Sequence, residues 1–322
     1  MILVSGEALI DLIGHEGDDG GYLPVVGGAN ANVAMALAKA EVPHRFLARI
    51  SSDSFGQKIK SHLQSYNVDL SLAVDAAEQT TLAIATIDSS GVASYSFYII
   101  GTADWAWDPA ELPGAEAIIE LGAKAVQFGC LTAAIEPGST VLANWLAELA
   151  NFGDITLSHD LNIRPSLGFD RATELDRVTK LNSISHIIKA SDADIEWLFD
   201  LAAGADLAEI ASNWTMHGQL LIITRGAEGV EVYHNGERLE VPAQKIALVD
   251  TVGAGDTFMA NFLVKLDDFG VLGINPREKL RSLNSENLVQ ALNYATAAAA
   301  IVCERAGCQP PTRQEVELRL KG

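Results

Sequence analysis

The chain has 322 residues, 48% of them hydrophobic, which is enough for a substantial core in one large domain or two small ones. Its 42 acidic and 22 basic residues give a formal net charge of −20, which argues against nucleic acid and anionic membrane surfaces as partners. The first residues lack a basic leader and include Glu7 and Asp11, so neither a secretory signal nor a membrane span fits. Three scattered cysteines form no disulfide framework or zinc pattern, so a reducing cytoplasm is the expected location.

Short apolar runs alternate with helix-like segments over the first two thirds of the chain. This alternation predicts a mostly parallel sheet covered by helices on both faces, which is a three-layer α/β fold. The predicted strands are 2–6, 46–50, 125–129, 155–160, 186–190 and 220–224, and the predicted helices between them are 29–40, 54–66, 138–150, 192–202 and 206–218.

Two regions interrupt this alternation with β-branched and aromatic residues. Residues 22–26 form one predicted strand, and 81–88 and 92–100 form a hairpin joined by a Ser-Ser-Gly turn. We expect a small antiparallel sheet that acts as a lid. The predicted division is an α/β domain of residues 1–11, 27–80 and 106–322, with a lid of residues 12–26 and 81–105.

The last third is predicted to be mostly helical. The expected helices are 254–266, 285–306 and 312–320, and residues 267–284 are expected to form a loop with one short helical turn.

The segment DTVGAGDTF places Asp250 and Asp256 on either side of a Gly-Ala-Gly turn that leads into a predicted helix. Loop amides and the unpaired N–H groups of a helix N-terminus attract anions. The negative charge of Asp256 would compete with a bound phosphate. An aspartate at this position therefore makes sense only if its role requires it to lie close to a phosphate. The chain has no Walker-type phosphate loop, and no G-x-G-x-x-G follows the first strand, which disfavours a nicotinamide oxidoreductase.

A second glycine cluster, Gly27-Gly28, precedes the helix that carries Asn32. Glycines let a ligand approach the backbone closely, and an asparagine side chain can donate to and accept from a polyol. Taken alone, a plain turn before a helix explains this cluster better.

Together, GGANANVAMAL (27–37) and DTVGAGDTF (250–258) resemble the two signature segments of the ribokinase family of carbohydrate kinases, also called the PfkB-type family. Further landmarks in the family's order extend the resemblance over essentially the whole chain. They are Gly6, Glu7 and Asp11 near the first strand, DLNIRP (160–165), TRGAEG (224–229) and the helix from Asn293 to Gly307. The resemblance implies a Rossmann-like ribokinase fold and transfer of the γ-phosphate of ATP to a hydroxyl of a sugar or nucleoside.

The resemblance also implies residue roles. Asp256 would be the catalytic base, and the N–H groups of Gly253, Ala254, Gly255 and Asp256 would form the anion hole; a helix N-cap is the structural alternative for Asp256. Phosphoryl transfer needs mainly positioning and charge stabilisation, so the carboxylate can accept the proton late without being a strong base. Mg²⁺ and Arg164 would offset its repulsion of phosphate.

The remaining implied contacts divide between acceptor and nucleotide. Without the resemblance, TRGAEG would be a tight turn and the alanine-rich helix near Asn293 would be core. The expected sugar contacts are Asp11, Gly27, Gly28, Asn32, Phe97, Asp104, Arg164 and Asp256, and the expected nucleotide contacts are Thr224, Gly226, Gly229, Gly253, Gly255, Asn293 and Gly307.

The expected metal site departs from the family pattern. Ser191 and Asp194 stand where many members carry the Asn and Glu of an Asn-x-x-Glu pattern that helps hold Mg²⁺ through water. Asp194 is a suitable oxygen ligand, and Glu196 competes with it. The backbone carbonyls of Asp250 and Val252 match positions that hold a monovalent cation, such as K⁺, in some relatives.

The acceptor is expected to be a neutral sugar. Ala103-Asp104 after an aromatic strand resembles fructokinase-like members, and Ile99-Ile100 stand where many members place an arginine that would suit an acidic sugar. Fructose is favoured over 2-keto-3-deoxygluconate, ribose or a nucleoside, and a non-catalytic sensor is the alternative of another class. Trp105 and Trp107 could stack on a sugar or anchor the lid, and the lid strands could pair with those of a second subunit in a homodimer.

Overall fold

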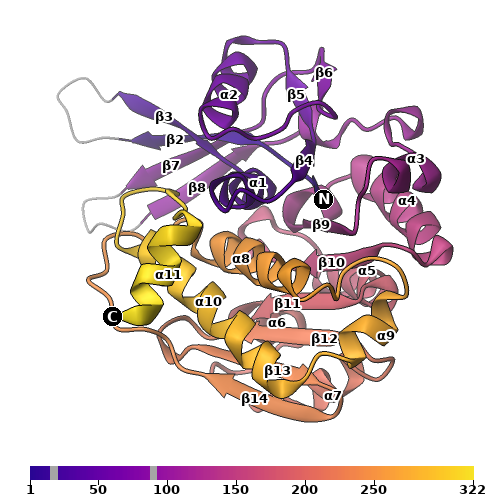
Figure 1. The fold of residues 1–322 in the computed structure, drawn as a ribbon. Helices are drawn as coiled ribbons and strands as arrows, with labels where there is room; N and C mark the ends of the chain where they lie inside the picture. Colours follow the sequence, from indigo (N-terminus) through magenta and orange to yellow (C-terminus); the bar gives the residue numbers. More distant parts are fainter. Residues whose placement is uncertain (15–20, 88–92) are drawn as a thin grey trace.

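The computed structural model describes residues 1–14, 21–87 and 93–322 (Figure 1). Within these ranges the larger sheet has eight strands in the spatial order β14-β13-β12-β11-β10-β9-β1-β4. The strands from β12 to β4 run parallel, and β13 and β14 add an antiparallel hairpin at one edge. Their bounds are β1 (Ile2–Ser5), β4 (His44–Leu47), β9 (Ala125–Gly129), β10 (Thr156–Asp160), β11 (Ile187–Ser191), β12 (Leu220–Thr224), β13 (Val230–His234) and β14 (Glu237–Val241).

Helices cover both faces of this sheet, as the alternation of strands and helices predicts. Ile222 of β12 packs into a core shared with α1, α8 and α10, whereas its neighbours Leu221 and Ile223 pack with α6 and α7. The first face carries α1 (Ala29–Lys39), α2 (Ser54–Ser65), α8 (Ala254–Asp268), α9 (Pro276–Arg281), α10 (Ser285–Cys303) and α11 (Arg313–Lys321). The second carries α3 (Ala115–Glu120), α4 (Gly138–Phe152), α5 (Arg171–Ile184), α6 (Asp192–Leu198) and α7 (Ala208–Trp214).

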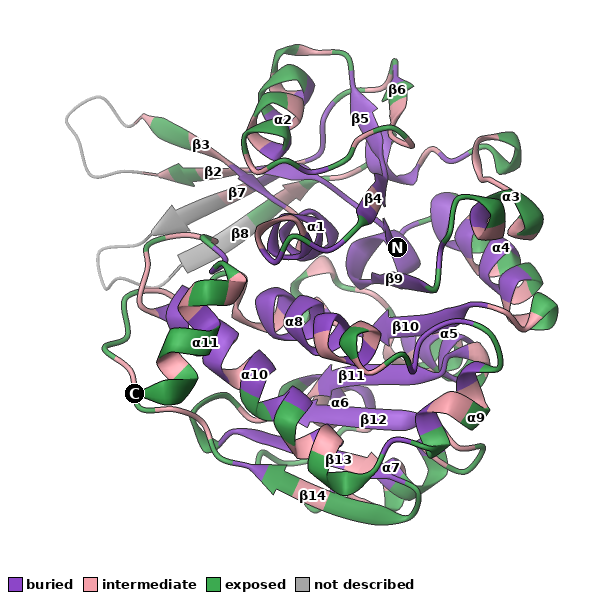
Figure 2. Ribbon diagram, viewed as in Figure 1, coloured by how far each residue is buried: buried purple, intermediate pink, exposed green. Residues whose placement is uncertain are grey.

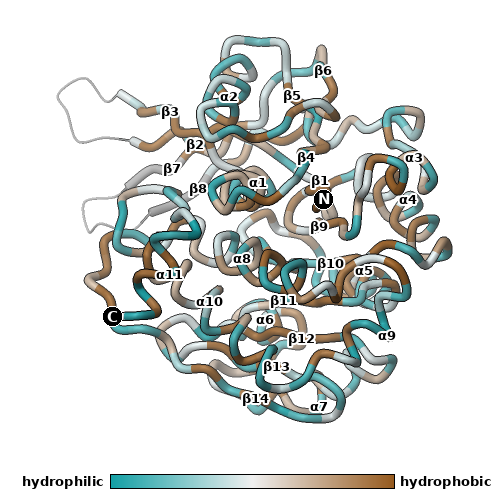
Figure 3. The backbone as a smooth tube through the Cα atoms, viewed as in Figure 1, coloured by the Kyte–Doolittle hydropathy of each residue, from teal (hydrophilic) through white to brown (hydrophobic). Residues whose placement is uncertain are grey.

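The central strands are buried on both faces, which explains why they are continuous apolar runs in the sequence. In β9 and β10 every residue is buried, and β12 is buried except at its last residue (Figure 2). The hydropathy colouring shows the same concentration of hydrophobic residues along β12 (Figure 3). The predicted three-layer α/β fold with a mostly parallel sheet is confirmed.

The smaller sheet has the strand order β3-β2-β7-β8 and projects from one side of the molecule (Figure 1). Its strands are β2 (Leu9–Gly14), β3 (Tyr22–Gly27), β7 (Leu82–Ile87) and β8 (Ala93–Tyr98). Both hairpins are antiparallel, and β2 and β7 join them as a parallel pair. β2 starts at Leu9, so the proposed lid boundary at residue 12 falls inside a strand. The predicted Ser-Ser-Gly turn and residues 15–20 of the lid segment lie outside the described residues.

Several elements differ from the sequence predictions. The predicted strand 46–50 is two strands, because β5 (Arg49–Ser51) leaves the main sheet to pair with β6 (Val74–Ala76). The β13–β14 hairpin and the helices α3 and α5 were not predicted. The predicted helix 192–202 ends at Leu198, and Asp200 beyond it has a positive φ of 55°, which interrupts a helix. The expected short helical turn within 267–284 is α9.

The structure favours the anchoring role for both tryptophans. Trp105, in the short helical turn Ala103–Trp105, and Trp107 are buried in separate core clusters. Their rings are therefore packed against protein. Of the helices in the described part of the chain, none combines the length and the apolar character that a membrane crossing needs.

Candidate active site

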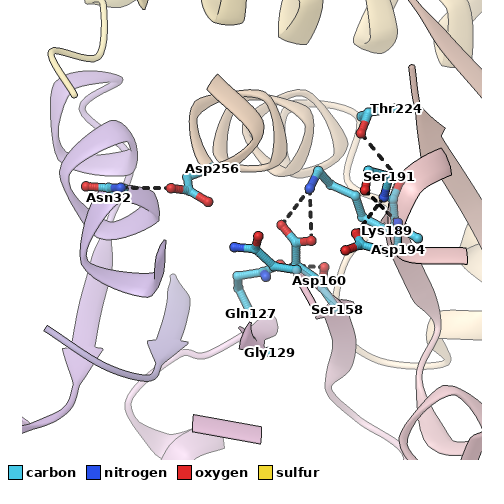
Figure 4. A network of polar contacts seen from close by, with 12 residues as sticks. Asn32, Gln127, Gly129, Ser158, Asp160, Lys189, Ser191, Asp194, Thr224 and Asp256 are labelled. Atoms are coloured by element: carbon cyan, nitrogen blue, oxygen red, sulfur yellow. Dashed lines mark hydrogen bonds and ion pairs between the residues drawn. The ribbon is translucent and has the colours of Figure 1, made fainter. Parts of the chain in front are cut away.

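The candidate site lies where the carboxyl ends of the parallel strands face the N-terminus of α8 (Figure 4). Asp160 ends β10, Ser191 ends β11 and Thr224 ends β12. Ligands of open α/β sheets bind at this edge, because the loops that leave the strands converge there. The side chains predicted to carry chemistry are thus gathered by topology from distant parts of the sequence.

The turn before α8 is shaped by its glycines. Gly253 is the N-cap of α8 with a left-handed φ of 75°, and no side chain caps the helix. The first N–H groups of a helix have no intrahelical acceptor. The N–H of Ala254 donates to the carbonyl of Thr251 at 3.2 Å, whereas the amides of Gly255 and Asp256 have no backbone acceptor among the described residues. A Cβ on Gly253 would lie 2.3 Å from Cys308 Sγ. The turn therefore requires glycine for both conformation and space, and it leaves an open helix N-terminus that suits an anion.

Asp256 lies in the first turn of α8 and is only 8% exposed. Its Oδ2 accepts a hydrogen bond of 2.8 Å from Asn32 Nδ2, a residue of α1 that is 224 positions away (Figure 4). Burial raises the pKa of Asp256 to about 7, against the opposing effect of the Asn32 hydrogen bond. Because Asp256 does not cap α8, the helix N-cap alternative is wrong, and a carboxylate with a pKa near neutrality suits a general base.

The predicted sugar contacts converge at the base of the smaller sheet. Asp11 lies in β2, and a Cβ on Gly27 of β3 would lie 2.2 Å from Asp11 Oδ2, so the carboxylate packs against the bare glycine. Burial raises the pKa of Asp11 to about 6, and the charge of Arg164 opposes this rise. Gly28 caps α1 with a φ of 110°. In the described chain Asn32 Oδ1 is buried without a hydrogen-bond partner, so it remains available as an acceptor.

Arg164 joins the two halves of the site electrostatically. Its Nη1 donates to the carbonyls of Asn162 and Ile163 at 3.3 and 3.1 Å. The charge of its guanidinium acts on the carboxylates of Asp11 and Asp256. Arg164 is therefore placed to compensate negative charge between the smaller sheet and α8.

Asp104 and Phe97 lie at the root of the smaller sheet. Asp104 is 2% exposed, and its Oδ1 accepts from the N–H of Ala8 at 2.9 Å, which fixes the chain that leads into β2. Burial raises the pKa of Asp104 to about 7. Phe97 in β8 packs against the core cluster that contains Leu9. Asp104 and Phe97 thus pack against the chain segment around Ala8 and Leu9, next to the predicted sugar contacts. Direct contact of either residue with a sugar remains a prediction.

The predicted nucleotide contacts Thr224, Gly226 and Gly229 lie at the end of β12 and in the turn that follows it. Thr224 Oγ1 donates to the carbonyl of Ala190 at 3.4 Å, and Gly226 follows with a φ of 49°. Gly229 has a φ of 108°, and a Cβ there would lie 2.2 Å from the carbonyl oxygen of Val241. The backbone of this turn thus packs closely against the end of β14.

The loop after α10 is tied to the chain before α8. Asp250 Oδ2 accepts from the N–H of Gly307 at 2.8 Å, and its Oδ1 accepts from the N–H of Val252 at 3.0 Å. Gly307 has a left-handed φ of 68°, and Asn293 is exposed on α10. The structure brings Gly307 to the glycine-rich turn and leaves the Asn293 side chain at the surface.

Asp194 is better placed than Glu196 to bind a metal. Its Oδ1 and Oδ2 accept from the N–H groups of Ile163 and Ser191 at 2.9 and 2.8 Å, which holds the carboxylate at the strand ends. Glu196 instead accepts from Gly204 N at 2.6 Å. No group of three or more metal-binding side chains occurs among the described residues. Mg²⁺ usually keeps waters and phosphates and takes one or two carboxylates, so Asp194 fits such a hydrated ion.

Lys189 was not predicted from the sequence, although its charge lies within the site. Lys189 Nζ lies 2.9 and 2.8 Å from the two carboxylate oxygens of Asp160 (Figure 4). A lysine inside the apolar run HIIKA was the available signal, because lysine is almost never buried without a partner.

The role of Glu7 inside the fold was also missed. Its buried carboxylate accepts from Ala29 N at 3.0 Å, from Asn30 Nδ2 at 3.0 Å and from Thr132 Oγ1 at 2.6 Å. Glu7 therefore connects the end of β1 to the first turn of α1, which carries Asn32.

The chain is similar to known sugar kinases over its whole length. The sequence pattern of the pfkB family of carbohydrate kinases matches residues 1–315. A fructokinase of Rhizobium leguminosarum bv. trifolii is 36% identical over 272 residues, which are 83% of this chain and 79% of that protein.

Solved structures show the same fold. The crystal structure of a Xylella fastidiosa fructokinase with bound ATP has a TM-score of 0.88 at 25% identity and covers 99% of this chain and 98% of its own. The aminoimidazole riboside kinase of Salmonella enterica shares the fold with a TM-score of 0.79 at 19% identity and covers 100% of this chain and 99% of its own. The chain therefore belongs to the pfkB family of carbohydrate kinases and is an ATP-dependent sugar kinase.

Proposed function

We propose that the chain is a fructokinase in which Asp256 is the general base and the amides of Gly253, Ala254, Gly255 and Asp256 form the anion hole. The observation that carries this proposal is the position of Asp256. It is a buried carboxylate in the first turn of the uncapped helix α8, and it is hydrogen-bonded to Asn32 of α1, the helix that follows Gly28. A hydroxyl at this carboxylate would stand next to a phosphate at the helix N-terminus.

The reaction follows from this arrangement. A sugar hydroxyl oxygen attacks the γ-phosphorus of ATP, and its proton passes to Asp256 as the new O–P bond forms. The bond between the γ-phosphorus and the β–γ bridging oxygen breaks, and ADP leaves with that oxygen. The open amides of α8 stabilise the equatorial oxygens of the transferred group. Mg²⁺ would supply further charge stabilisation and would be held through water by Asp194.

The sugar side of the proposal combines the smaller sheet and α1. Asp11 and Asn32 Oδ1 accept hydrogen bonds from sugar hydroxyls, and the bare backbone of Gly27 and Gly28 admits the ring. The positive charge of Arg164 interacts with the carboxylates of Asp11 and Asp256. These carboxylates offset that charge, so little of it is left to attract an acidic sugar. A neutral ketose fits this balance, and the fructokinase name of the 36% identical relative supports fructose.

The proposal also includes contacts with the nucleotide, a monovalent cation site and closure of the smaller sheet over the sugar. Residues around the turn after β12 and the loop after α10 bind the nucleotide, and a monovalent cation such as K⁺ binds the backbone carbonyls of Asp250 and Val252. Lid closure through the smaller sheet would keep ATP from water. The nucleotide contacts are Thr224, Gly226, Gly229, Gly253, Gly255, Asn293 and Gly307, and the remaining sugar contacts are Phe97 and Asp104.

The test is a coupled assay of ADP release with MgATP and a panel of fructose, ribose, 2-keto-3-deoxygluconate and adenosine. We expect the highest kcat/KM with fructose and little ADP release without an acceptor. Adenosine belongs in the panel because a riboside kinase shares this fold. A preference for any other acceptor contradicts the fructose assignment, and equal ADP release with and without sugar contradicts lid closure.

A further inference from the structure

Lys189 and Asp160 form a buried ion pair inside the candidate site. The side chains are only 6% and 7% exposed, and they lie between Asp256 and Asp194 (Figure 4). Two charges removed from water in this way cost more than their attraction returns unless the geometry is very good, and an apolar pair of similar volume often leaves a protein equally stable or more so. Stability alone therefore does not account for an ion pair at this place.

The pair uses only part of the hydrogen-bonding capacity of the lysine. An ammonium group has three N–H donors. In the described chain the hydrogen bonds of Lys189 Nζ go to the two oxygens of Asp160 alone. At least one buried N–H of Lys189 is therefore left for another acceptor.

The first turn of α8 lies beside this ammonium group. A Cβ on Gly255 would lie 3.3 Å from Lys189 Nζ, so the ammonium group stands beside the point where any other residue would carry its side chain. The amide of Gly255 is one of the open donors at the N-terminus of α8. An anion bound at these amides would also lie next to the ammonium group.

The charges at the strand ends sum to a negative value even with Lys189 present. The carboxylates of Asp160, Asp194 and Asp256 all interact with the two cations Lys189 and Arg164, and Asp160 also interacts with the other two carboxylates. Three negative and two positive groups leave this cluster with one excess negative charge before any phosphate arrives. Removing Lys189 alone would double that excess at the place where ATP must bind.

We propose that Lys189 is a further catalytic residue, whose remaining N–H donates to an oxygen of the transferred phosphoryl group at the first turn of α8. Asp160 is its positioning residue, because it holds the ammonium group by two hydrogen bonds. Lys189 exchanges no proton in this step. It stabilises the equatorial charge while the bond to the β–γ bridging oxygen breaks. This inference rests on the proposed kinase reaction and adds a residue to it.

The decisive comparison is between Asp160→Asn and the double variant Lys189→Gln/Asp160→Asn. The first keeps the lysine charge and a side-chain oxygen that can accept from Nζ. The second replaces the lysine by a neutral side chain in the same background. We expect kcat with fructose to fall by no more than about tenfold in the single variant and by a further 100-fold or so in the double variant, as when an oxyanion-hole donor is removed.

Binding measurements separate this role from a structural one. By calorimetry, MgADP is expected to bind the double variant within about threefold of the parent, whereas the added affinity from aluminium fluoride and fructose, which mimic the transferred group and the acceptor, is lost. A purely structural pair predicts the opposite order: the single variant, which leaves a buried lysine without a counter-charge, would be the less stable and less active of the two.

Failure of the proposed role of Lys189 can be told apart from failure of the proposed kinase function. A parent enzyme that phosphorylates no member of the acceptor panel overturns both. Only the role of Lys189 is overturned if the parent is active and the kcat of the double variant stays within threefold of that of Asp160→Asn. If the double variant does not fold, Lys189→Met/Asp160→Leu supplies an apolar pair, and its kcat is expected to show the same large loss.

Discussion

The two sheets of this kinase bury their strands differently. β9 to β12 are covered by helices on both faces, whereas the strands of the smaller sheet carry exposed apolar side chains at Ile13, Leu23 and Tyr98. The candidate site takes residues from both, with Asp160 and Asp256 from the packed body and Asp11 and Gly27 from the smaller sheet.

This difference suggests a division of roles. Catalytic groups must be held in a fixed geometry, which the packed body provides. A sugar must enter and leave, which the less buried sheet permits. Changes in the body should therefore lower kcat, and changes in the lid sheet should raise the KM for the sugar.

The largest expected effect is that of Asp256→Asn. Loss of the general base should lower kcat with fructose by about 10³-fold, with the KM for ATP nearly unchanged. Steady-state kinetics measure this. Asp267→Asn on the same helix is the matched control, because Asp267 pairs with Lys124 outside the site and an exposed pair has little energetic effect. A kcat within tenfold of the parent would contradict the base assignment.

Gly253→Ala should have the next largest effect. The added methyl group meets Cys308 Sγ, and the left-handed φ of 75° strains any L side chain, so the anion hole shifts and kcat should fall by about 100-fold. Gly122→Ala is the control, because it has a similar φ of 80° but open space around it. Equal losses of activity in both variants would assign the effect to instability.

Asp11→Asn tests the lid side of the comparison. A hydrogen bond to a charged group contributes about 1.5–3 kcal/mol, so the KM for fructose should rise by at least tenfold with kcat and the KM for ATP little changed. Asp75→Asn, at an exposed carboxylate that pairs with Lys60, should leave all three constants as they are. An equal loss in kcat would show that Asp11 belongs to the chemistry instead.

The pH dependence of kcat/KM should reveal the raised pKa of the buried base Asp256. Asp256 is active when ionised, and burial raises its pKa to about 7, so kcat/KM should fall by about tenfold per pH unit below 7 and level off above it. Protonation of Asp11, whose pKa is raised to about 6, should steepen the fall below pH 6. An acid limb that ends near pH 4 would mean that Asp256 is not the group that titrates.

The smallest kinetic effect is expected for Leu23→Ser combined with Tyr98→Ser. Both side chains are more than half exposed on lid strands, and we propose that these strands pair with those of a second copy. The variant should elute as a smaller species in size-exclusion chromatography, while kcat changes by less than about twofold. An unchanged elution volume argues against pairing through the lid.

The sequence predicted the parts of the fold whose signals are local. β9 and β12 were predicted at their observed bounds because burial on both faces makes them apolar runs. The β13–β14 hairpin was missed even though Asn235-Gly236 is a strong turn signal between alternating strands. Helix α5 was missed because few of its residues are apolar.

The site was only partly accessible from sequence. The resemblance pointed to Asp256 and Asn32, and the structure adds that they are hydrogen-bonded across 224 residues. Lys189 and Asp160 were missed because the order of strands in the sheet, which no local pattern contains, decides that their side chains meet.

A single-turnover experiment tests the central role of Asp256 most directly. Enzyme in excess over radiolabelled MgATP is mixed with fructose and quenched, and labelled sugar phosphate is measured over time for the parent and for Asp256→Asn. We predict that both proteins bind the ATP but that only the parent transfers the label quickly, with a rate constant about 10³-fold above that of the variant. Transfer at similar rates in both proteins would contradict the account.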